Sequence, residues 1–296
     1  MAVRPLIIDT DPGKDDAVAI LAALGAREFV HVILMTTVAG NVSLAQTTAN
    51  ALRLCQVIGR TDIPVHAGCP RALLQPGHMV PDIHGDDGLG GATLPAPKGG
   101  PADGHAVPAI IAAIRNASEP VTIAALAPVT NIALALVMAP DIIDNIAEIA
   151  IMGGSFSGGN ITPYASYNLH SDPHAARIVF SCGAAVTMVG LDVTRKTMPT
   201  PEWLADLRAT NKPAARVVAG LWDNPTLCFN DACVTAHIVR PEIFRSDKRC
   251  VEIEINDPVR IGETRVVDGE ARTTALLDVD REAFFALIHD ALVGTQ

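Results

Sequence analysis

The chain has 296 residues, of which 49% are hydrophobic and only 4% aromatic, and its formal net charge at pH 7 is −10. This length allows one large α/β domain or two small ones, with a mainly aliphatic core. The negative charge argues against binding to nucleic acid or to an anionic membrane surface, and no apolar run is long enough to span a bilayer.

The first predicted element is a buried strand at residues 6–8, which leads into the sequence DTDPGKDD and then a helix. Four carboxylates follow this strand within eight residues: Asp9, Asp11, Asp15 and Asp16. Ligands bind at the carboxyl ends of strands in open α/β sheets. Helix capping would account for one or two of these carboxylates, but the others would repel each other unless a cation neutralised them. We therefore predict a site for a hard metal ion here, with helix capping alone as the alternative.

Strand-like and helical patterns alternate along the rest of the chain. The predicted elements are, in order, a strand at 30–38, a helix at 43–58, a short strand at 63–65, a Gly- and Pro-rich loop at 67–100, a helix at 108–117, a strand at 121–126, a helix at 132–138, a strand at 147–152, a helix at 175–180, a strand at 185–191, alternating strands from 251, and a last helix at 281–293. This order predicts an open, mostly parallel α/β sheet covered by helices, with a small antiparallel element near the C-terminus. We find no linker and predict a single domain over residues 1–296.

Loops that follow the strands of a parallel sheet lie at one edge of that sheet. We therefore expect the acidic segment 9–16 to meet Asn41, the pair at 130–131 and the Gly-rich segment 152–168. Asp231 stands at the head of another helical pattern and could join them. The sequence thus predicts one site built from distant segments.

The six cysteines form no CxxC pair, which is typical of buried thiols in a reducing compartment. The first predicted strand begins within a few residues of the first Met, so we expect no signal peptide. The sequence therefore predicts a soluble cytoplasmic protein.

The segment DTDPGKDD at residues 9–16 resembles the N-terminal signature of the inosine-uridine preferring nucleoside hydrolases, which cleave the N-glycosidic bond of ribonucleosides. Seven further segments match in the family's order: the Gly40-Asn41 turn with Asn50-Ala51, HGDDGLG at 84, APVTNIALAL at 127, MGGSFSGGNITP at 152, YNLHSDPHAA at 167, LDVT at 191, and NDACVTAHIVRPEIF at 230. The resemblance covers nearly the whole chain. It implies an open α/β sheet of Rossmann-like topology and a homo-oligomer.

The resemblance also implies one bound calcium ion (Ca2+). Its ligands at the matching positions would be Asp11, Asp16, the backbone carbonyl of Thr130, and Asp231. All four are hard oxygen donors, which suit calcium or magnesium and exclude a zinc site built from thiolates or imidazoles. Asp11 would in addition serve as general base toward a water activated by the metal.

Other matching positions would hold the substrate. The ribose hydroxyls would contact Asp15, Asn41, Asn160 and Asn168, with Met152 packing nearby. N-glycosidic cleavage passes through an oxocarbenium-like transition state, and carboxylate and amide groups around the sugar stabilise its positive charge. The residues at these positions therefore suit the chemistry that the resemblance implies.

Two positions depart from the family pattern. Ser166 stands where the family often has a Glu that helps to hold the ribose 5′-hydroxyl, and its side chain is too short to reach as far without a water. Asn230 replaces the His that protonates the leaving base in many members, and an amide cannot act as a general acid near neutral pH. His84 matches a family histidine near the base, so it either assists the leaving group or packs its loop. Otherwise the substrate must carry a good leaving group.

These observations predict a calcium-dependent ribonucleoside hydrolase that releases ribose and a free base from a small-molecule substrate, as a dimer or tetramer. Two alternatives remain open. A haloacid-dehalogenase-like phosphohydrolase also begins with a strand ending in Asp-x-Asp, although that family continues with Gly-Thr where this chain has Pro12-Gly13. A metal-bound ribose sensor would have kept the sugar pocket and lost catalysis together with the histidine.

Overall fold

The structure is a computed structural model that describes residues 3–76, 79–222 and 227–294. In these residues the main sheet has eight strands in the order β3-β2-β1-β4-β5-β6-β10-β7. The strands are β1 (Arg4–Thr10), β2 (Val30–Thr37), β3 (Val65–Ala67), β4 (Val121–Ala125), β5 (Ile146–Met152), β6 (Val186–Val189), β7 (Phe244–Arg249) and β10 (Thr273–Val279). Every neighbouring pair is parallel except β10 and β7, so the predicted mostly parallel sheet is confirmed.

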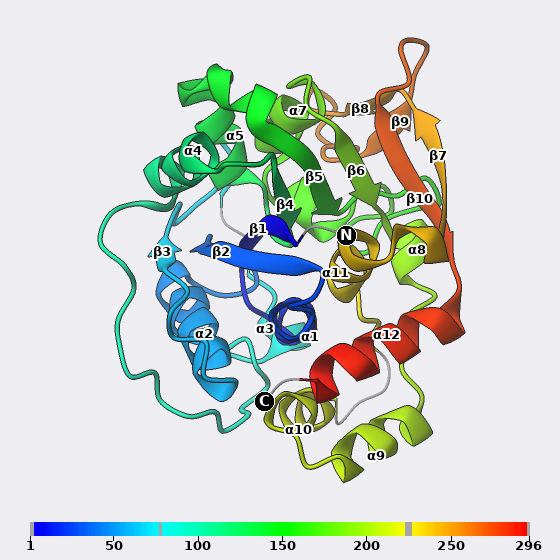
Figure 1. The fold of residues 1–296 in the computed structure, drawn as a ribbon. Coiled ribbons are helices and arrows are strands. Elements are labelled where there is room, and N and C mark those ends of the chain that lie inside the picture. The colour runs from blue at the N-terminus through cyan, green and yellow to red at the C-terminus, as the bar shows by residue number, and fades with distance from the viewer. Residues whose placement is uncertain (1–2, 77–78, 223–226, 295–296) are drawn as a thin grey trace.

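Helices cover both faces of this sheet (Figure 1). The helices on one face are α1 (Lys14–Gly25), α2 (Leu44–Val57), α10 (Pro213–Leu221), α11 (Ala232–Val239) and α12 (Arg281–Val293), and those on the other are α4 (Ala106–Asn116), α5 (Thr130–Met138) and α7 (Pro173–Phe180). All five residues of β4 are buried. A strand covered on both faces must be apolar along its whole length, which explains the continuous aliphatic runs of the sequence.

Shorter elements connect these layers. They are α3 (Pro81–His84), α6 (Tyr167–Ser171), α8 (Leu191–Thr194), α9 (Pro201–Ala209), and two 3-10 turns, η1 (Pro140–Asn145) and η2 (Pro241–Ile243). Helix α3 lies within the segment that we predicted to be loop. Pro81 fixes the backbone at its first position, and Gly85, with φ +80°, ends it. This one-turn helix carries His84.

A second sheet near the C-terminus pairs β8 (Val251–Ile253) with β9 (Thr264–Val266), and this pair is antiparallel. The small antiparallel element predicted there is therefore confirmed. The sequence did not predict that β7 and β10 belong to the main sheet. Strand β7 forms one edge of that sheet, and four of its six side chains are exposed.

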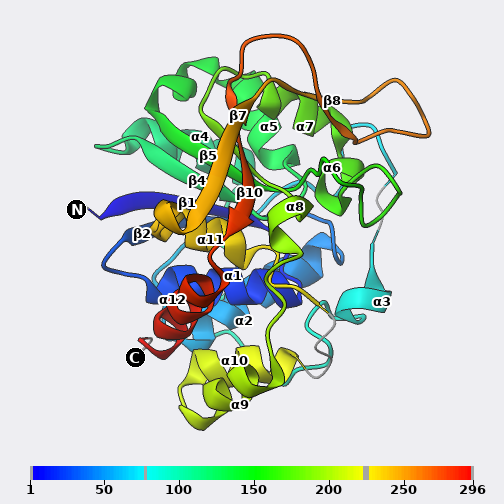
Figure 2. The same ribbon diagram turned by 90° about the vertical axis from the view of Figure 1, so that its right-hand side faces the viewer.

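The carboxyl ends of β1 and β4 define the position of the site. Strand β1 lies between β2 and β4, so the strand order reverses direction at this point. In open α/β sheets a crevice for ligands forms at such a reversal, outside the carboxyl ends of the strands. The segments that follow β1, β2, β4 and β5 all emerge at this edge, where α3 and α6 also lie (Figure 2).

Within the described part of the chain, none of the helices has the length and apolar character needed to cross a membrane.

Candidate active site

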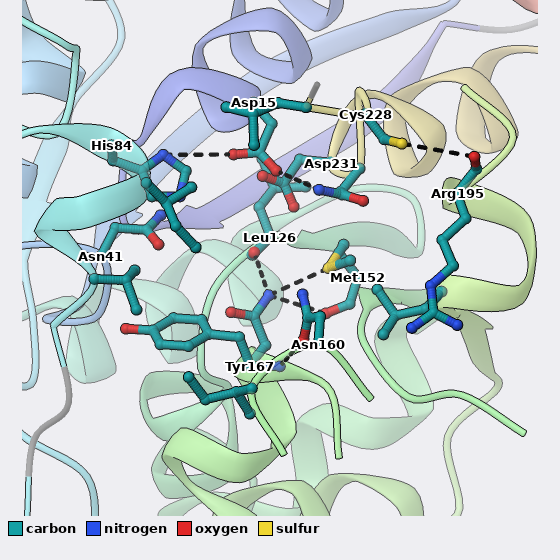
Figure 3. A pocket seen from close by; sticks show the side chains of 17 residues that line it. Asp15, Asn41, His84, Leu126, Met152, Asn160, Tyr167, Arg195, Cys228 and Asp231 are labelled. Carbon is teal, nitrogen blue, oxygen red and sulfur yellow. Dashed lines mark hydrogen bonds and ion pairs between the residues drawn. The ribbon is translucent and has the colours of Figure 1, made fainter. Parts of the chain in front are cut away.

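A pocket lies at the carboxyl edge of the sheet and brings together segments that are far apart in sequence (Figure 3). The predicted site residues that line it are Asp15, Asn41, His84, Met152, Asn160, Asn168, Asn230 and Asp231. They come from the start of α1, the end of β5, the loops after β2 and β5, helices α3 and α6, and the segment before α11. The expected convergence of these loops therefore occurs in the fold.

Buried carboxylates lie at one side of this pocket. Oxygen atoms of Asp15, Asp16 and Asp231 all lie within 4.8 Å of one another. Asp11 lies next to them, because Asn41 donates its backbone N–H to Asp11 Oδ2 (2.7 Å) and its amide to Asp16 Oδ2 (3.2 Å). A Cβ atom at position 40 would overlap the Asp11 carboxylate, so this close approach requires Gly40.

Hydrogen bonds satisfy only part of the acidic group. Asp16 accepts from the Thr10 hydroxyl (2.6 Å) and from the Gly13 backbone N–H (2.9 Å). By contrast, Asp11 Oδ1 and Asp231 Oδ1 are buried and have no hydrogen-bond partner in the described residues. Unpaired buried oxygens are costly unless another ligand satisfies them. The all-oxygen donor set and these two unpaired atoms fit a hard cation such as calcium or magnesium.

The electrostatics of the group point the same way. Burial, together with the negative charge of Asp15, raises the pKa of Asp16 to about 6. Burial also raises the pKa values of Asp11 and Asp231 well above their usual range, and the neighbouring carboxylates act in the same direction. Ionisation of these carboxyl groups is therefore disfavoured unless a positive charge compensates their burial, which a divalent cation would do.

Asp15 has a different environment from the other acids. Its Oδ2 accepts a hydrogen bond from Asn230 Nδ2 (3.0 Å), and its Oδ1 lies 4.0 Å from His84 Nδ1 (Figure 3). His84 Nδ1 accepts from the backbone N–H of Lys14 (3.1 Å), so the neutral ring carries its proton on Nε2. Burial lowers the pKa of His84, which favours this neutral form.

The protein fixes the orientation of three asparagine amides around the pocket. Asn168 donates both N–H groups to the carbonyls of Leu126 (2.7 Å) and Met152 (3.0 Å), and Asn41 donates to the Asp11 carbonyl (3.1 Å) and to Asp16. Their Oδ1 atoms are therefore the ones available to accept from a ligand. Asn160 has the opposite orientation, because its Oδ1 accepts from the Tyr167 N–H (2.8 Å) and leaves Nδ2 as a donor.

Comparison with known families separates the alternatives left open by the sequence. The family model described as inosine-uridine preferring nucleoside hydrolase matches residues 6–286. The chain belongs to this family. It is therefore an enzyme that hydrolyses N-glycosidic bonds of ribonucleosides, and the phosphohydrolase alternative is set aside.

Individual nucleoside hydrolases agree over nearly the full length. The chain is 38% identical to a pyrimidine-specific ribonucleoside hydrolase, RihA, of Photobacterium profundum, with 98% of this chain and 99% of that protein covered. It is also 38% identical to RihA of Escherichia coli K12, over 97% and 98% of the two chains. Among solved structures, a purine-preferring ribonucleoside hydrolase from Gardnerella vaginalis superposes with a TM-score of 0.93 at 30% identity, covering 99% of both chains.

Two residues of the acidic and Thr-Asn motifs lie away from the nucleoside hydrolase pocket. Asp9 accepts from Thr36 (2.6 Å) and Asn131 (2.8 Å) inside the sheet, and burial raises its pKa to about 6. Thr130 is the first residue of α5, and its hydroxyl donates to Asp172 (2.7 Å). The backbone carbonyl of the first residue of a helix points along the helix toward the N–H four residues later, so it does not point out of the start of α5. Leu126, directly after β4, lines the pocket instead, and its backbone carbonyl accepts from the Asn168 amide (Figure 3).

Ser166 also lies behind the pocket and not in its lining. It is 1% exposed, and its hydroxyl oxygen accepts from the Gly154 backbone N–H (2.7 Å). The structure thus assigns Ser166 to the support of the loop after β5.

Several lining residues were not predicted from the sequence. They are Val80, Ile83, Leu126, Ile161, Tyr167, Leu191, Arg195, Leu227 and Cys228. Most are apolar, so they add hydrophobic surface to a pocket that also contains carboxylates. Tyr167, Ile161 and Leu191 lie in segments that match the family, but nothing in those segments marked them as binding residues.

Proposed function

We propose that this nucleoside hydrolase depends on calcium and cleaves ribonucleosides with Asp11 as the general base. The observation that carries the proposal is the buried acidic group with two unpaired oxygens beside a pocket of hydrogen-bond acceptors. The cation would be held by Asp11, Asp16 and Asp231, with the Leu126 carbonyl in the position that we had expected for Thr130. When bound, calcium would neutralise these carboxylates and orient a water molecule next to the sugar.

The acceptors around the pocket suit the hydroxyl groups of ribose. Asp15 and the Oδ1 atoms of Asn41 and Asn168 accept hydrogen bonds, so they would take them from the 2′- and 3′-hydroxyls. Their partial and full negative charges also stabilise the positive charge that develops on the sugar as the bond to the base breaks. Asp11 Oδ1, which has no hydrogen-bond partner among the described residues, would take the proton of the attacking water.

The leaving base would receive neutral hydrogen bonds. His84 in its neutral form presents Nε2–H, and Asn230 retains one N–H after donating the other to Asp15. An amide cannot transfer a proton near neutral pH, and the lowered pKa of His84 disfavours the protonated ring that could, so a base that leaves without full protonation is favoured. The curated relatives at 37–38% identity are described as pyrimidine-specific, and we infer that pyrimidine ribonucleosides are the preferred class.

The decisive experiment measures ribose release from uridine, cytidine, inosine and p-nitrophenyl riboside, with added calcium and with a chelator. We expect turnover with calcium and none in the chelated, metal-free protein. Full activity without metal contradicts the calcium proposal. Tight binding of ribosides with no product would instead indicate a sensor.

We further propose that the protein is a single-domain homo-oligomer, a dimer or tetramer, in the cytoplasm. The resemblance of the sequence to its family supports the oligomer, and six free cysteines support a reducing compartment. The mass in solution, measured by light scattering, tests the first statement. A monomeric mass at enzyme concentrations that support full activity contradicts it.

A further inference from the structure

The loop of residues 153–166, between β5 and α6, carries Asn160 to the pocket and is held by two side chains of the neighbouring α8 turn. Asp192 Oδ2 accepts from the backbone N–H of Phe156 (2.8 Å). Arg195 Nη2 donates to the carbonyls of Gly158 (3.0 Å) and Gly159 (2.8 Å), and its Nη1 donates to the Ser157 hydroxyl (3.4 Å). Together these two side chains, which we call the α8 pair, bind four consecutive residues of the loop.

The bound segment requires glycine. Gly158 has φ +102°, a backbone conformation that residues with a side chain rarely adopt. A Cβ atom at Gly159 would overlap the carbonyls of Thr162 and Ala165. Two adjacent glycines have more backbone freedom than other residues, so the conformation of this segment depends on the hydrogen bonds that hold it. Some come from within the loop, where Gly159 donates its N–H to the Pro163 carbonyl (3.1 Å) and Asn160 to the Ala165 carbonyl (3.2 Å), and the others come from the α8 pair.

Asn160 comes directly after these glycines and lines the pocket together with Arg195 (Figure 3). Its Oδ1 accepts from the Tyr167 N–H, so the amide Nδ2 is the group that it can offer to a ligand. A displacement of Gly159 moves the Asn160 backbone with it. Even a shift of about 1 Å in a positioning group can lower the rate of an enzyme by about 100-fold.

The chemistry of Arg195 supports a positioning function more than a stabilising one. Arg195 is exposed, and its hydrogen bonds go to two neutral carbonyls and a hydroxyl. Because Arg195 is exposed, water competes for its guanidinium group, so these hydrogen bonds add little to the stability of the fold. The rigid, planar guanidinium can nevertheless bridge two successive carbonyls, which fixes their relative orientation.

We propose that the α8 pair, Asp192 and Arg195, positions Asn160 so that its amide donates a hydrogen bond to the riboside. The inference rests on the proposed function, because it requires a riboside in the pocket. Asp192 and Arg195 are positioning residues in this inference and act through the loop that they bind; because Arg195 also lines the pocket, the test has to separate this effect from a direct contact with the substrate.

A double-mutant cycle tests this inference. Arg195→Met removes the guanidinium and keeps most of the apolar stem, and we expect kcat/KM for uridine to fall about 10- to 100-fold, mainly through KM. In an Asn160→Ala background, the same substitution should change kcat/KM less than about threefold, because the group that Arg195 positions is gone. The melting temperature should shift by no more than about 3 °C.

Matched variants complete the test. Arg115→Met removes another exposed arginine, which binds Asp141 on the surface far from the pocket, and should leave kcat/KM unchanged. Asp192→Asn keeps an oxygen that can accept from Phe156 and should retain more activity than Asp192→Ala. Equal losses from Arg195→Met in both backgrounds, or no loss in either, overturn the inference. Failure of the proposed function has a different signature: the wild-type protein itself then releases no ribose. Failure of the α8 pair inference leaves wild-type ribose release intact.

Discussion

The hydrogen bond from Asn230 to Asp15 allows the leaving-group chemistry to be tested with one pair of substitutions. Asn230→Ala removes a neutral donor 3.0 Å from a carboxylate that is 14% exposed. A hydrogen bond to a charged group contributes about 1.5–3 kcal/mol, and 1.4 kcal/mol corresponds to a factor of ten. If Asp15 depends on this bond in the transition state, kcat/KM should fall about 10- to 150-fold for every riboside.

Asn230→His should behave differently. An imidazole can still donate to Asp15, and the adjacent carboxylate favours its protonated form, which also offers an acidic proton to the leaving base. We expect inosine turnover to rise by up to about 10²- to 10⁴-fold, whereas p-nitrophenyl riboside, whose leaving group needs no proton, should change little.

The assay compares kcat/KM for inosine and p-nitrophenyl riboside in the wild-type protein and in both variants. The expected pattern is a common loss for Asn230→Ala and a change in the ratio of the two substrates for Asn230→His. Wild-type protein that hydrolyses inosine as readily as p-nitrophenyl riboside would refute the reasoning. Another acid would then be present, and His84 is the best-placed candidate.

Three further predictions follow from the site and the core. Chelation should abolish ribose release and calcium should restore it, and a chelated sample that stays active contradicts this calcium dependence. Asp11→Ala should lower kcat by at least about 10²-fold even with calcium present. The acceptors around the pocket should favour ribosides strongly over 2′-deoxyribosides, and equal kcat/KM for uridine and 2′-deoxyuridine rules this out. Ribosides modified at the 5′ position should still be accepted, because Ser166 binds Gly154 and does not hold that end of the sugar. Burial alone would raise the pKa of Glu148, but the hydrogen bond and charge of His237 (2.9 Å) hold it below its ordinary value of 4.5. The contribution of Glu148 to stability is therefore fully present above about pH 4.5 and is lost as the pH falls through its lower pKa in the folded protein. Glu148→Gln should make the free energy of unfolding depend less on pH in the acid range. An unchanged curve of stability against pH argues against this prediction.

The sequence predicted the parts of the site that side-chain patterns can mark. The run DTDPGKDD after a buried strand identified the acidic group, and the alternation of strands and helices placed Asn41 and Asn168 at the same edge. A backbone ligand has no such signal, because any residue has a carbonyl. The Thr130 carbonyl was expected only from the resemblance to the family, and it is Leu126, four residues earlier, that lines the pocket.

Other parts depend on long-range packing. Arg195 reaches the pocket because α8 lies beside the loop after β5, and no local pattern records that neighbourhood. Ser166 was considered as a short sugar ligand, but the distance to Gly154 shows that it supports the loop. The pairing of β7 with β10 across intervening residues 250–272 likewise follows from the fold and not from periodicity.

The edges of the main sheet restrict how copies of this protein can associate. One edge strand, β3, has only three residues, and the other, β7, has the sequence FRSDKR, with most of its side chains in solvent. A short or highly charged edge is a poor template for another strand, because an incoming chain finds few backbone partners or must desolvate charged groups. Growth of the eight-stranded sheet is therefore disfavoured at both ends, so strand pairing is a poor route by which copies of this protein could associate.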